Sequence, residues 1–410
     1  MHSASLPWDQ ARRVASAASS QRPAIAERLE GALHCILAAP IGALTDLPPF
    51  PTAAMDGFAV AGTGPWHVIS DEPLLAGAEP DAVSLDRGYA VPIATGAAMP
   101  PGADAVLRRE HAALETALHG SRLYARDPLT GLPDDAGGEV ASGTDVRPQG
   151  EECAVGDPLV AAGSTVTPAI LGLAAAAGYD ALEVIPPPTV AVLVVGDELL
   201  ERGIPRPGRV RDALGPMVPP WLAAAGARAN PPLRVADTHR GLLDEIEDST
   251  ADVIVTTGST ASGPVDFVHD VLDHLGVHWL VDGVQVRPGH PMLLAVLPDG
   301  RPFIGLPGNP LAAVSGLVTL AVPVINAMRG APSVQHHARL AETVRAHPSD
   351  TRLIPVVLRD DLAHPLRYDG PAMLRSLALA DALAAIPPGS GDRDSDVEVL
   401  PLPGNGADVR

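Results

Sequence analysis

The sequence contains no lysine, so all 28 of its basic residues are arginines. A Schiff base to a substrate and a Walker-type phosphate loop both need a lysine amine, and both are therefore excluded. Any bound anion must be held by arginine, histidine, backbone N–H groups or a metal ion. The net charge of −21 argues against nonspecific nucleic-acid binding and attachment to anionic membranes, because both require basic patches.

Aromatic residues and cysteines are also scarce. Aromatics make up only 3% of the chain, so its cores must be built from Ala, Val, Leu and Ile. Cys35 and Cys153 lack metal-site spacing, and we expect free, partly buried thiols in a reducing cytoplasm. No signal peptide opens the chain, and its longest apolar stretch, Leu311 to Ile325, is too short to span a bilayer. We therefore expect a cytoplasmic protein.

Glycine and proline are abundant, with 40 and 44 residues, and they divide the first half into short elements. Apolar side chains at helical spacing predict a helix from Ala24 to Ala39. From Asp56 to about Asp145, short apolar runs alternate with turns, as in a small β-rich unit. An alanine-rich helix is expected from Ile170 to Gly178, and Pro186 to Pro188 is the clearest linker.

After that linker, strands alternate with helices of about ten residues, which indicates βαβ units and a doubly wound, mostly parallel, three-layer α/β/α sheet. The expected strands are Thr189–Val195, Leu233–Val235, Val253–Thr257, Val277–Val281, Met292–Leu297 and Phe303–Leu306; the expected helices are Ala213–Gly226, Arg240–Asp248, Val265–Leu275 and Leu311–Ile325. Short strands return near the end and predict a small C-terminal β-domain: Leu353–Leu358, Ala384–Ile386 and Val397–Leu400.

The turn Gly305-Leu306-Pro307-Gly308-Asn309-Pro310 joins the last of these α/β strands to the last helix. Its two prolines fix φ, and Asn309 suits a helix N-cap. A rigid turn of this kind should present free backbone N–H groups at a helix N-terminus, a favourable place for an oxyanion. A plain strand-to-helix turn is the alternative.

Ligands of a doubly wound sheet bind beyond the carboxyl ends of its strands, where further motifs lie. These motifs are Gly196-Asp197-Glu198, Asp237-Thr238 and Thr257-Gly258-Ser259, with Asp266 following. The carboxylates Glu198, Asp237 and Asp266 suggest a hard divalent cation, most simply Mg²⁺, although helix capping or solvation would also explain them. Arg287-Pro288-Gly289-His290 places two basic groups beside a rigid turn, which suits an oxyanion, although His290 is also explained as a structural residue.

Together these residues resemble the molybdopterin molybdenumtransferases, a family that includes the C-terminal part of gephyrin. The resemblance covers nearly the whole chain. The stretches that carry it are Pro48–Phe50, Ala54–Val60, Ala94–Gly96, Pro101–Val106, Val146–Gly178, Gly196–Leu199, Thr257–Gly258 with Asp266, Gly305–Pro310 and Met373–Ala378.

The resemblance implies four subdomains and an elongated homodimer whose active site is shared between protomers. The implied bounds are 1–46 with 145–186 for an N-terminal linker domain, 47–144 for a β-rich insertion, 187–331 for the molybdopterin-binding α/β domain and 332–410 for a C-terminal β-barrel-like domain. The implied reaction inserts molybdate into adenylylated molybdopterin, releases AMP and depends on Mg²⁺. Molybdopterin adenylyltransferase and other cofactor-synthesis proteins are candidate partners.

The resemblance also implies roles for individual residues. Catalytic roles fall on Asp56, Thr95, Asp237, Asp266, Arg287 and His290, and metal ligation on Glu198 and Asp266. Contacts with the pterin nucleotide fall on Gly196, Asp197, Asp212, Thr257, Gly258, Ser259, Pro307, Gly308, Asn309, Pro310 and Ser376.

Several positions depart from the family pattern. Arg287 and His290 stand where the family usually has lysines. Apolar residues replace polar ones at Ala53, Leu214, Ala261 and Ala312, while Ser259 replaces a glycine and Glu152 an aspartate. The lost polar groups leave a second hypothesis open, that of a non-catalytic paralogue that binds a pterin nucleotide or scaffolds other proteins.

Overall fold

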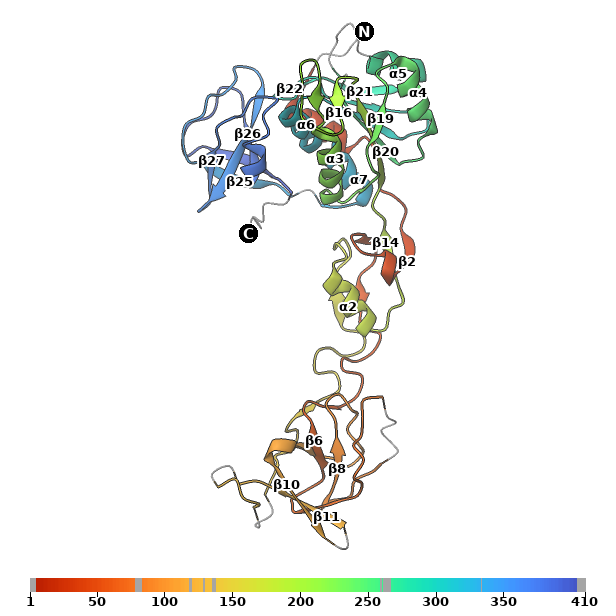
Figure 1. The fold of residues 1–410 in the computed structure, drawn as a ribbon, viewed down its shortest axis with the longest axis vertical. Coiled ribbons are helices and arrows are strands. Elements are labelled where there is room, and N and C mark those ends of the chain that lie inside the picture. The colour runs from red at the N-terminus through yellow and green to blue at the C-terminus, as the bar shows by residue number, and fades with distance from the viewer. Residues whose placement is uncertain are drawn as a thin grey trace.

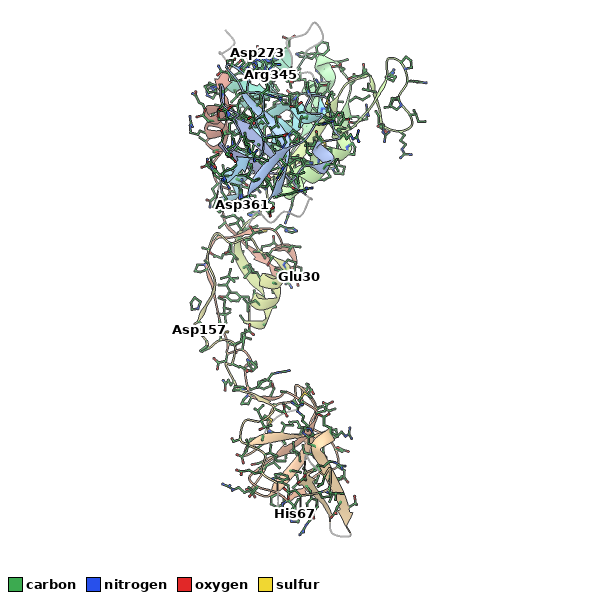
Figure 2. The ribbon with its side chains drawn as sticks, turned by 90° about the vertical axis from the view of Figure 1, so that its left-hand side faces the viewer. Glu30, His67, Asp157, Asp273, Arg345 and Asp361 are labelled. Carbon is green, nitrogen blue, oxygen red and sulfur yellow. The ribbon has the colours of Figure 1, made fainter. Side chains whose placement is uncertain are left out.

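The computed structural model shows an elongated molecule made of three bodies along its long axis (Figure 1). It describes residues 5–77, 83–117, 120–127, 130–134, 138–258, 260, 267–332 and 334–403. One end holds an α/β domain with a β-barrel beside it, the middle a small domain, and the other end a β-rich domain. The turned view shows the same separation, with His67 in the β-rich domain and Glu30 and Asp157 in the middle one (Figure 2).

The α/β domain is built on one sheet with the strand order β18-β15-β20-β24-β23-β21, and β19 also pairs with β15. Pairing is parallel from β18 to β24 and antiparallel at β23 and β21. The strands are β15 (Thr189–Val195), β18 (Arg228–Ala229), β19 (Leu233–Val235), β20 (Val253–Thr257), β21 (His278–Asp282), β23 (Leu293–Val296) and β24 (Pro302–Leu306). The predicted mostly parallel sheet is confirmed.

Different helices cover the two faces of this sheet, because successive side chains of a strand point to opposite sides. Val192 and Val194 of β15 join a core with α1 (Trp8–Ser16), α3 (Leu214–Ala224), α6 (Pro310–Gly316) and α7 (Val322–Arg329). Leu193 and Val195 face a second core with α4 (His239–Asp248) and α5 (Phe267–Leu275). Continuous apolar strands such as β15 are buried for this reason.

The longest apolar helix runs from Pro310 to Arg329 and passes through one π-turn, Leu317–Ala321, between α6 and α7. Pro323 lacks an N–H donor, which disturbs the hydrogen bonding of this turn. At 20 residues the helix is long enough to cross a membrane, so the expectation that this stretch is too short is wrong. However, 83% of its most apolar window is buried within the protein, which makes it a core helix.

The C-terminal domain is a small closed barrel in which β26-β27-β25-β29-β28 form a ring because β28 pairs back with β26. Its strands are β25 (His336–Leu340), β26 (Thr351–Arg359), β27 (Leu362–Pro365), β28 (Ala382–Ile386) and β29 (Asp396–Pro401). Outside the ring, β22 (Val284–Arg287) pairs in parallel with β26, and β1 (Leu6–Pro7) pairs with β22. These pairings attach the barrel to the α/β domain.

The middle domain corrects one prediction. Residues 24–39 form no α-helix; they contain β2 (Ile25–Arg28) and β3 (Ile36–Leu37), which pair with β14 (Ala181–Ile185), and a short 3-10 turn, Leu29–Gly31, lies between them. Pairing with a strand far along the chain outweighs the local helical pattern there. A helix is instead found at α1, where none was predicted. The helix α2 (Pro168–Ala176) forms as expected, with Thr167 accepting a hydrogen bond from Ile170 N as its N-cap.

The β-rich domain is a sheet in the order β10-β11-β7-β8-β6-β9. Its strands are β6 (Gly57–Val60), β7 (Trp66–Val68), β8 (Tyr89–Ile93), β9 (Ala105–Arg108), β10 (Ala112–Ala117) and β11 (Gly120–Ala125). Three two-stranded pairs complete the fold: β4 (Ile41–Gly42) with β13 (Pro158–Val160), β5 (Thr52–Ala53) with β12 (Val146–Arg147), and β16 (Leu199–Leu200) with β17 (Val210–Arg211). Cys35 and Cys153 are free, as predicted, and both are buried rather than partly buried.

Candidate active site

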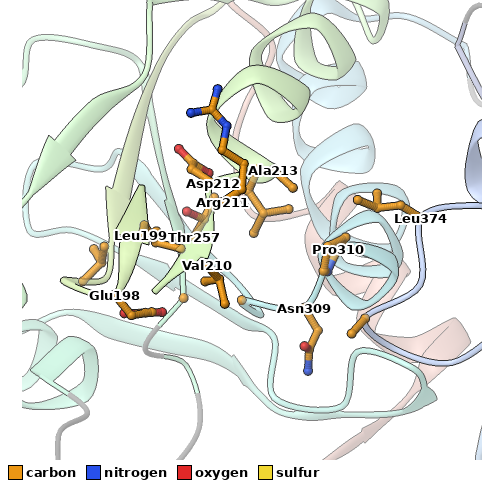
Figure 3. A pocket seen from close by; sticks show the side chains of 15 residues that line it. Glu198, Leu199, Val210, Arg211, Asp212, Ala213, Thr257, Asn309, Pro310 and Leu374 are labelled. Carbon is orange, nitrogen blue, oxygen red and sulfur yellow. The ribbon is translucent and has the colours of Figure 1, made fainter. Parts of the chain in front are cut away.

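A pocket of about 550 Å³ opens beyond the carboxyl ends of β15, β20 and β24 (Figure 3). Strand-end turns, the start of α3 and a loop of the barrel contribute to it. Its lining is Val195, Glu198, Leu199, Val210, Arg211, Asp212, Ala213, Leu214, Thr257, Gly258, Gly308, Asn309, Pro310, Ala372 and Leu374. The predicted residues Glu198, Asp212, Thr257, Gly258 and Gly308–Pro310 are thus brought together at one place, as expected for a doubly wound sheet.

Two carboxylates face this pocket from the side of β15. Glu198 follows the corner formed by Gly196 and Asp197, and Asp212 precedes α3 (Figure 3). Asp212 Oδ1 accepts a hydrogen bond from Gly215 N at 2.9 Å, which fixes the carboxylate at the start of α3. The other carboxylate oxygen, Oδ2, lies 3.8 Å from Arg234 Nη1. Asp212 is therefore oriented by the protein, with its charge partly balanced.

Asp197 and Asp237 lie at the edge of this group, outside the pocket lining. The backbone N–H of Asp237 points to Asp197 Oδ1 at 3.5 Å, and the Asp197 carbonyl accepts a hydrogen bond from Arg209 Nη1. The strand ends of β15 and β19 are therefore adjacent, as predicted. Ser259 and Asp266 lie outside the described residues.

The turn before α6 differs from the prediction in one respect. Asn309 occupies the N-cap position, but its side chain makes no capping hydrogen bond. The backbone N–H groups of Leu311 and Ala312 both donate to the Pro371 carbonyl, at 2.9 and 3.2 Å. The predicted open helix N-terminus is therefore wrong for these two donors, because a loop of the barrel satisfies them.

Donors remain in the turn itself. Within the described part of the chain, the N–H groups of Gly308 and Asn309 make no hydrogen bond, and both residues line the pocket. Pro307 and Pro310 have no N–H to offer. The turn after β20 lies against this one, since Gly258 N donates to Leu306 O at 2.9 Å. Among the described residues of these two turns, Gly308 and Asn309 are thus the pocket residues whose N–H groups remain for an anion.

The Arg287–His290 turn packs beside the pocket but does not line it. Arg287 Nε donates to Asp350 Oδ2 at 2.8 Å, and His290 Nδ1 donates to the Val284 carbonyl at 2.7 Å. Gly289 has φ +113°, and a Cβ atom there would lie 2.9 Å from Ser315 Cβ on α6. The turn therefore rests directly on the helix that begins at Pro310.

Asp350, the partner of Arg287, was not predicted from the sequence. Burial of this residue raises the pKa of its carboxyl, but hydrogen bonds from Arg287 and Ser349 outweigh that effect, so the net pKa is lowered. Asp350 is therefore a carboxylate at neutral pH. No sequence pattern joined Asp350 to Arg287, because the two belong to different domains.

Asp56 and Thr95 form a separate group. Thr95 donates to Asp56 Oδ1 through its backbone N–H at 2.7 Å and its hydroxyl at 2.8 Å, and these bonds lower the pKa of Asp56. Asp56 directly precedes β6, which lies in the β-rich domain at the opposite end of the molecule from α6 (Figure 1). A single chain therefore divides the predicted site residues into two distant groups.

Ser376 is buried, and its hydroxyl donates to the Tyr368 carbonyl at 2.6 Å. The hydroxyl thus braces the barrel loop, while Ala372 and Leu374 of the same loop line the pocket. These two and Arg211 are lining residues that the sequence did not reveal. The only sequence signal for Arg211 was that it directly precedes Asp212, a predicted site residue.

The donor set of the pocket suits a hard cation. Mg²⁺ prefers oxygen ligands, retains several waters and is commonly held by one or two carboxylates together with substrate phosphates. Glu198 supplies one such carboxylate at the pocket, and Asp212 a second. Among the described residues no group of three or more His, Cys, Asp or Glu side chains forms a complete metal cage. The two carboxylates of the pocket therefore suit a hard cation.

Comparisons with known proteins agree with this architecture. Three family profiles match: the MoeA N-terminal region (domain I and II) over residues 6–178, a probable molybdopterin binding domain over 191–327, and the MoeA C-terminal region (domain IV) over 337–402. Curated relatives named molybdopterin molybdenumtransferase include one from Staphylococcus aureus, 28% identical over 80% of this chain and 78% of its own. Another, from Synechococcus elongatus, is 28% identical over 76% and 77%.

Solved structures show the same likeness. A molybdopterin biosynthesis MoeA protein from Pyrococcus horikoshii, 27% identical, superposes with a TM-score of 0.70 over 98% of this chain and 100% of its own. A second MoeA structure from Pyrococcus horikoshii, at 19% identity, shares the fold with a TM-score of 0.65 over 97% and 100%.

Proposed function

Since the chain belongs to the MoeA family, we propose that it is a molybdopterin molybdenumtransferase that inserts molybdate into adenylylated molybdopterin and releases AMP. The observation that carries this proposal is the pocket beyond β15, β20 and β24, which combines carboxylates at Glu198 and Asp212 with open N–H groups at Gly308 and Asn309. The N–H groups suit a phosphate or oxyanion, and the carboxylates suit a cation bound to it.

Glu198 would hold Mg²⁺ together with Asp266, the second ligand that the family resemblance implies, and with Asp212, which also lines the pocket; the ion would neutralise the phosphate charge that grows as the adenylyl bond breaks. The chain's own residues do the positioning. Asp212 is fixed at the start of α3, and Gly308 and Asn309 line the pocket with N–H groups that make no hydrogen bond among the described residues. Preorganised donors of this kind stabilise developing negative charge without reorganising during the reaction.

Arg287 and His290 extend the site toward molybdate in this proposal. The Arg287 side chain is 52% exposed, so its guanidinium can reach a dianion in solution. His290 is anchored through Nδ1 to the Val284 carbonyl, which leaves Nε2 for an external partner, and Nε2 donates to an oxyanion only as part of the imidazolium. The two side chains belong to one turn and would act on one oxyanion.

Two copies would share each site. Asp56 and Thr95 lie at the opposite end of the chain from the pocket, so they reach a pocket only if a second copy places its β-rich domain there. We therefore propose a homodimer with the subdomains 1–46 with 145–186, 47–144, 187–331 and 332–410. A cytoplasmic location and contact with molybdopterin adenylyltransferase follow from the same proposal.

One observation favours a second candidate function. Leu214 and Ala312 are apolar where the family pattern is polar, and the Ala312 N–H is already bonded to Pro371 O. A paralogue that binds a pterin nucleotide without turnover would tolerate these changes. It would bind the adenylylated substrate but would not release AMP when molybdate is added.

Purified protein, adenylylated molybdopterin, Mg²⁺ and molybdate test the first function directly. Release of AMP that requires molybdate supports the transferase, and binding without release supports the paralogue. Asp104→Asn is a control substitution outside the proposed site, because Asp104 Oδ2 accepts a hydrogen bond from Gly62 N in the β-rich domain. We expect this variant to release AMP as wild type does. Growth of a cell that lacks its own insertion enzyme, when supplied with this chain, gives an independent readout.

A further inference from the structure

The C-terminal barrel contributes a buried carboxylate beside the Arg287–His290 turn. β22 ends at Arg287 and pairs in parallel with β26, so that Arg287 lies opposite Arg352. Asp350 directly precedes β26 and is only 6% exposed. Its Oδ2 lies 2.8 Å from Arg287 Nε. A carboxylate of one domain is thus buried against the guanidinium of another.

Only one edge of that guanidinium is engaged. Within the described residues, Nη1 and Nη2 of Arg287 make no hydrogen bond. A guanidinium carries five N–H donors in a planar fork, so one edge can hold a carboxylate while the other meets an oxyanion. A lysine has a single ammonium group, which would have to serve both partners.

Asp350 is itself held in place. Ser349 Oγ donates to Asp350 Oδ1 at 2.8 Å, and the Asp350 backbone N–H donates to His347 Nδ1 at 3.0 Å. Because the carboxylate is fixed and buried, it also fixes the plane of a long and otherwise mobile side chain. The opposite side of the turn is fixed too, since Gly289 packs against α6.

We propose that Asp350 is a positioning residue that directs the outer edge of Arg287 toward the oxyanion, and that its presence favours arginine over lysine at position 287. This inference rests on the proposed function, in which Arg287 contacts molybdate. A lysine at this position would turn its one ammonium nitrogen toward the buried carboxylate, whereas arginine bonds Asp350 through Nε and keeps two further nitrogens for the anion. Removing the carboxylate would release that lysine.

The test compares four forms of the full-length protein: wild type, Arg287→Lys, Asp350→Asn and the double variant. Molybdate binding is measured by titration calorimetry, and KM and kcat by molybdate-dependent AMP release. We expect Arg287→Lys to weaken molybdate binding about tenfold and Asp350→Asn to raise KM about threefold at unchanged kcat. In the double variant, affinity should return to within about threefold of wild type.

The proposal is overturned if the lysine substitution has the same effect with and without Asp350. It is also overturned if the affinities of all four forms are equal. Asp396→Asn is the matched control, because Asp396 is an exposed carboxylate of the same barrel paired with His337 at 2.9 Å. We expect that control to bind molybdate as wild type does.

Two further comparisons keep the outcome decisive. If Asp350→Asn does not fold, the molybdate affinity of Arg287→Lys is compared with that of Arg287→Gln. Equal affinities support a lysine that is held by Asp350. A lysine form that binds molybdate as tightly as wild type overturns the proposal. A wild type that neither binds molybdate nor releases AMP refutes the proposed function, and the role of Asp350 with it. If wild type binds molybdate and releases AMP, but the effects of Arg287→Lys and Asp350→Asn simply add, only the role of Asp350 is refuted.

Discussion

At the scale of single residues, the contact between Asp56 and Thr95 shows whether the Thr95 hydroxyl contributes to function through Asp56. Thr95→Val removes the Oγ–H bond but keeps the backbone N–H bond to Asp56 Oδ1. The pKa of Asp56 should therefore rise toward its usual value, and AMP release should fall about tenfold. Thr95→Ser should restore both. A carboxyl titration followed by NMR measures the first effect, and an unchanged Asp56 pKa in Thr95→Val would contradict this role.

Asp350 gives a prediction about stability and pH. Its pKa in the folded protein is lowered, so its contribution to stability is complete above the unfolded carboxyl value of about 3.9 and is lost as pH falls through the lowered value. The melting temperatures of wild type and Asp350→Asn should therefore differ at pH 7 and converge in acid. A difference that stays constant down to about pH 2 would show that burial, not charge, sets the effect.

At the scale of elements, the turn that ends β22 depends on Gly289. Gly289→Ala places a Cβ atom 2.9 Å from Ser315 Cβ and adds strain at φ +113°. We therefore expect the free energy of unfolding to fall by about 2 kcal/mol. Gly300 is the matched control, with φ +89° and no atom within 4 Å of the place that an alanine Cβ would take. Gly300→Ala should cost about 1 kcal/mol. Urea unfolding measures both, and equal losses would contradict close packing of the turn on α6.

The elements also show what the sequence could and could not predict. Strands β15, β19 and β20 have the predicted bounds, because a buried parallel strand is a continuous apolar run between turns. The helix expected over residues 24–39 failed because β2 and β3 pair with β14, more than 140 residues later in the chain. The prediction of an open helix N-terminus failed for the same reason. The N–H groups of Leu311 and Ala312 bond to Pro371, which belongs to another domain. Local pattern carries no information about such distant contacts.

At the scale of the whole molecule, the two groups of candidate residues lie at opposite ends of an elongated chain (Figure 1). Of the strand-end residues that were predicted to meet, Glu198, Thr257–Gly258 and Gly308–Pro310 do so, because parallel strands share one edge. Nothing in the sequence pattern gave the distance between Asp56 and that edge. It follows from the small middle domain, in which β2, β3, β14 and α2 separate the β-rich domain from the α/β domain.

The most direct test of a site shared by two copies uses two inactive variants. Asp56→Asn disables one group and Glu198→Gln the other, so each protein alone should release no AMP. After unfolding and refolding together, a shared site predicts about a quarter of wild-type activity, because half of the dimers are mixed and each has one intact site. A mixture as inactive as its parents, with mixed dimers demonstrated by differently tagged chains, would contradict the account.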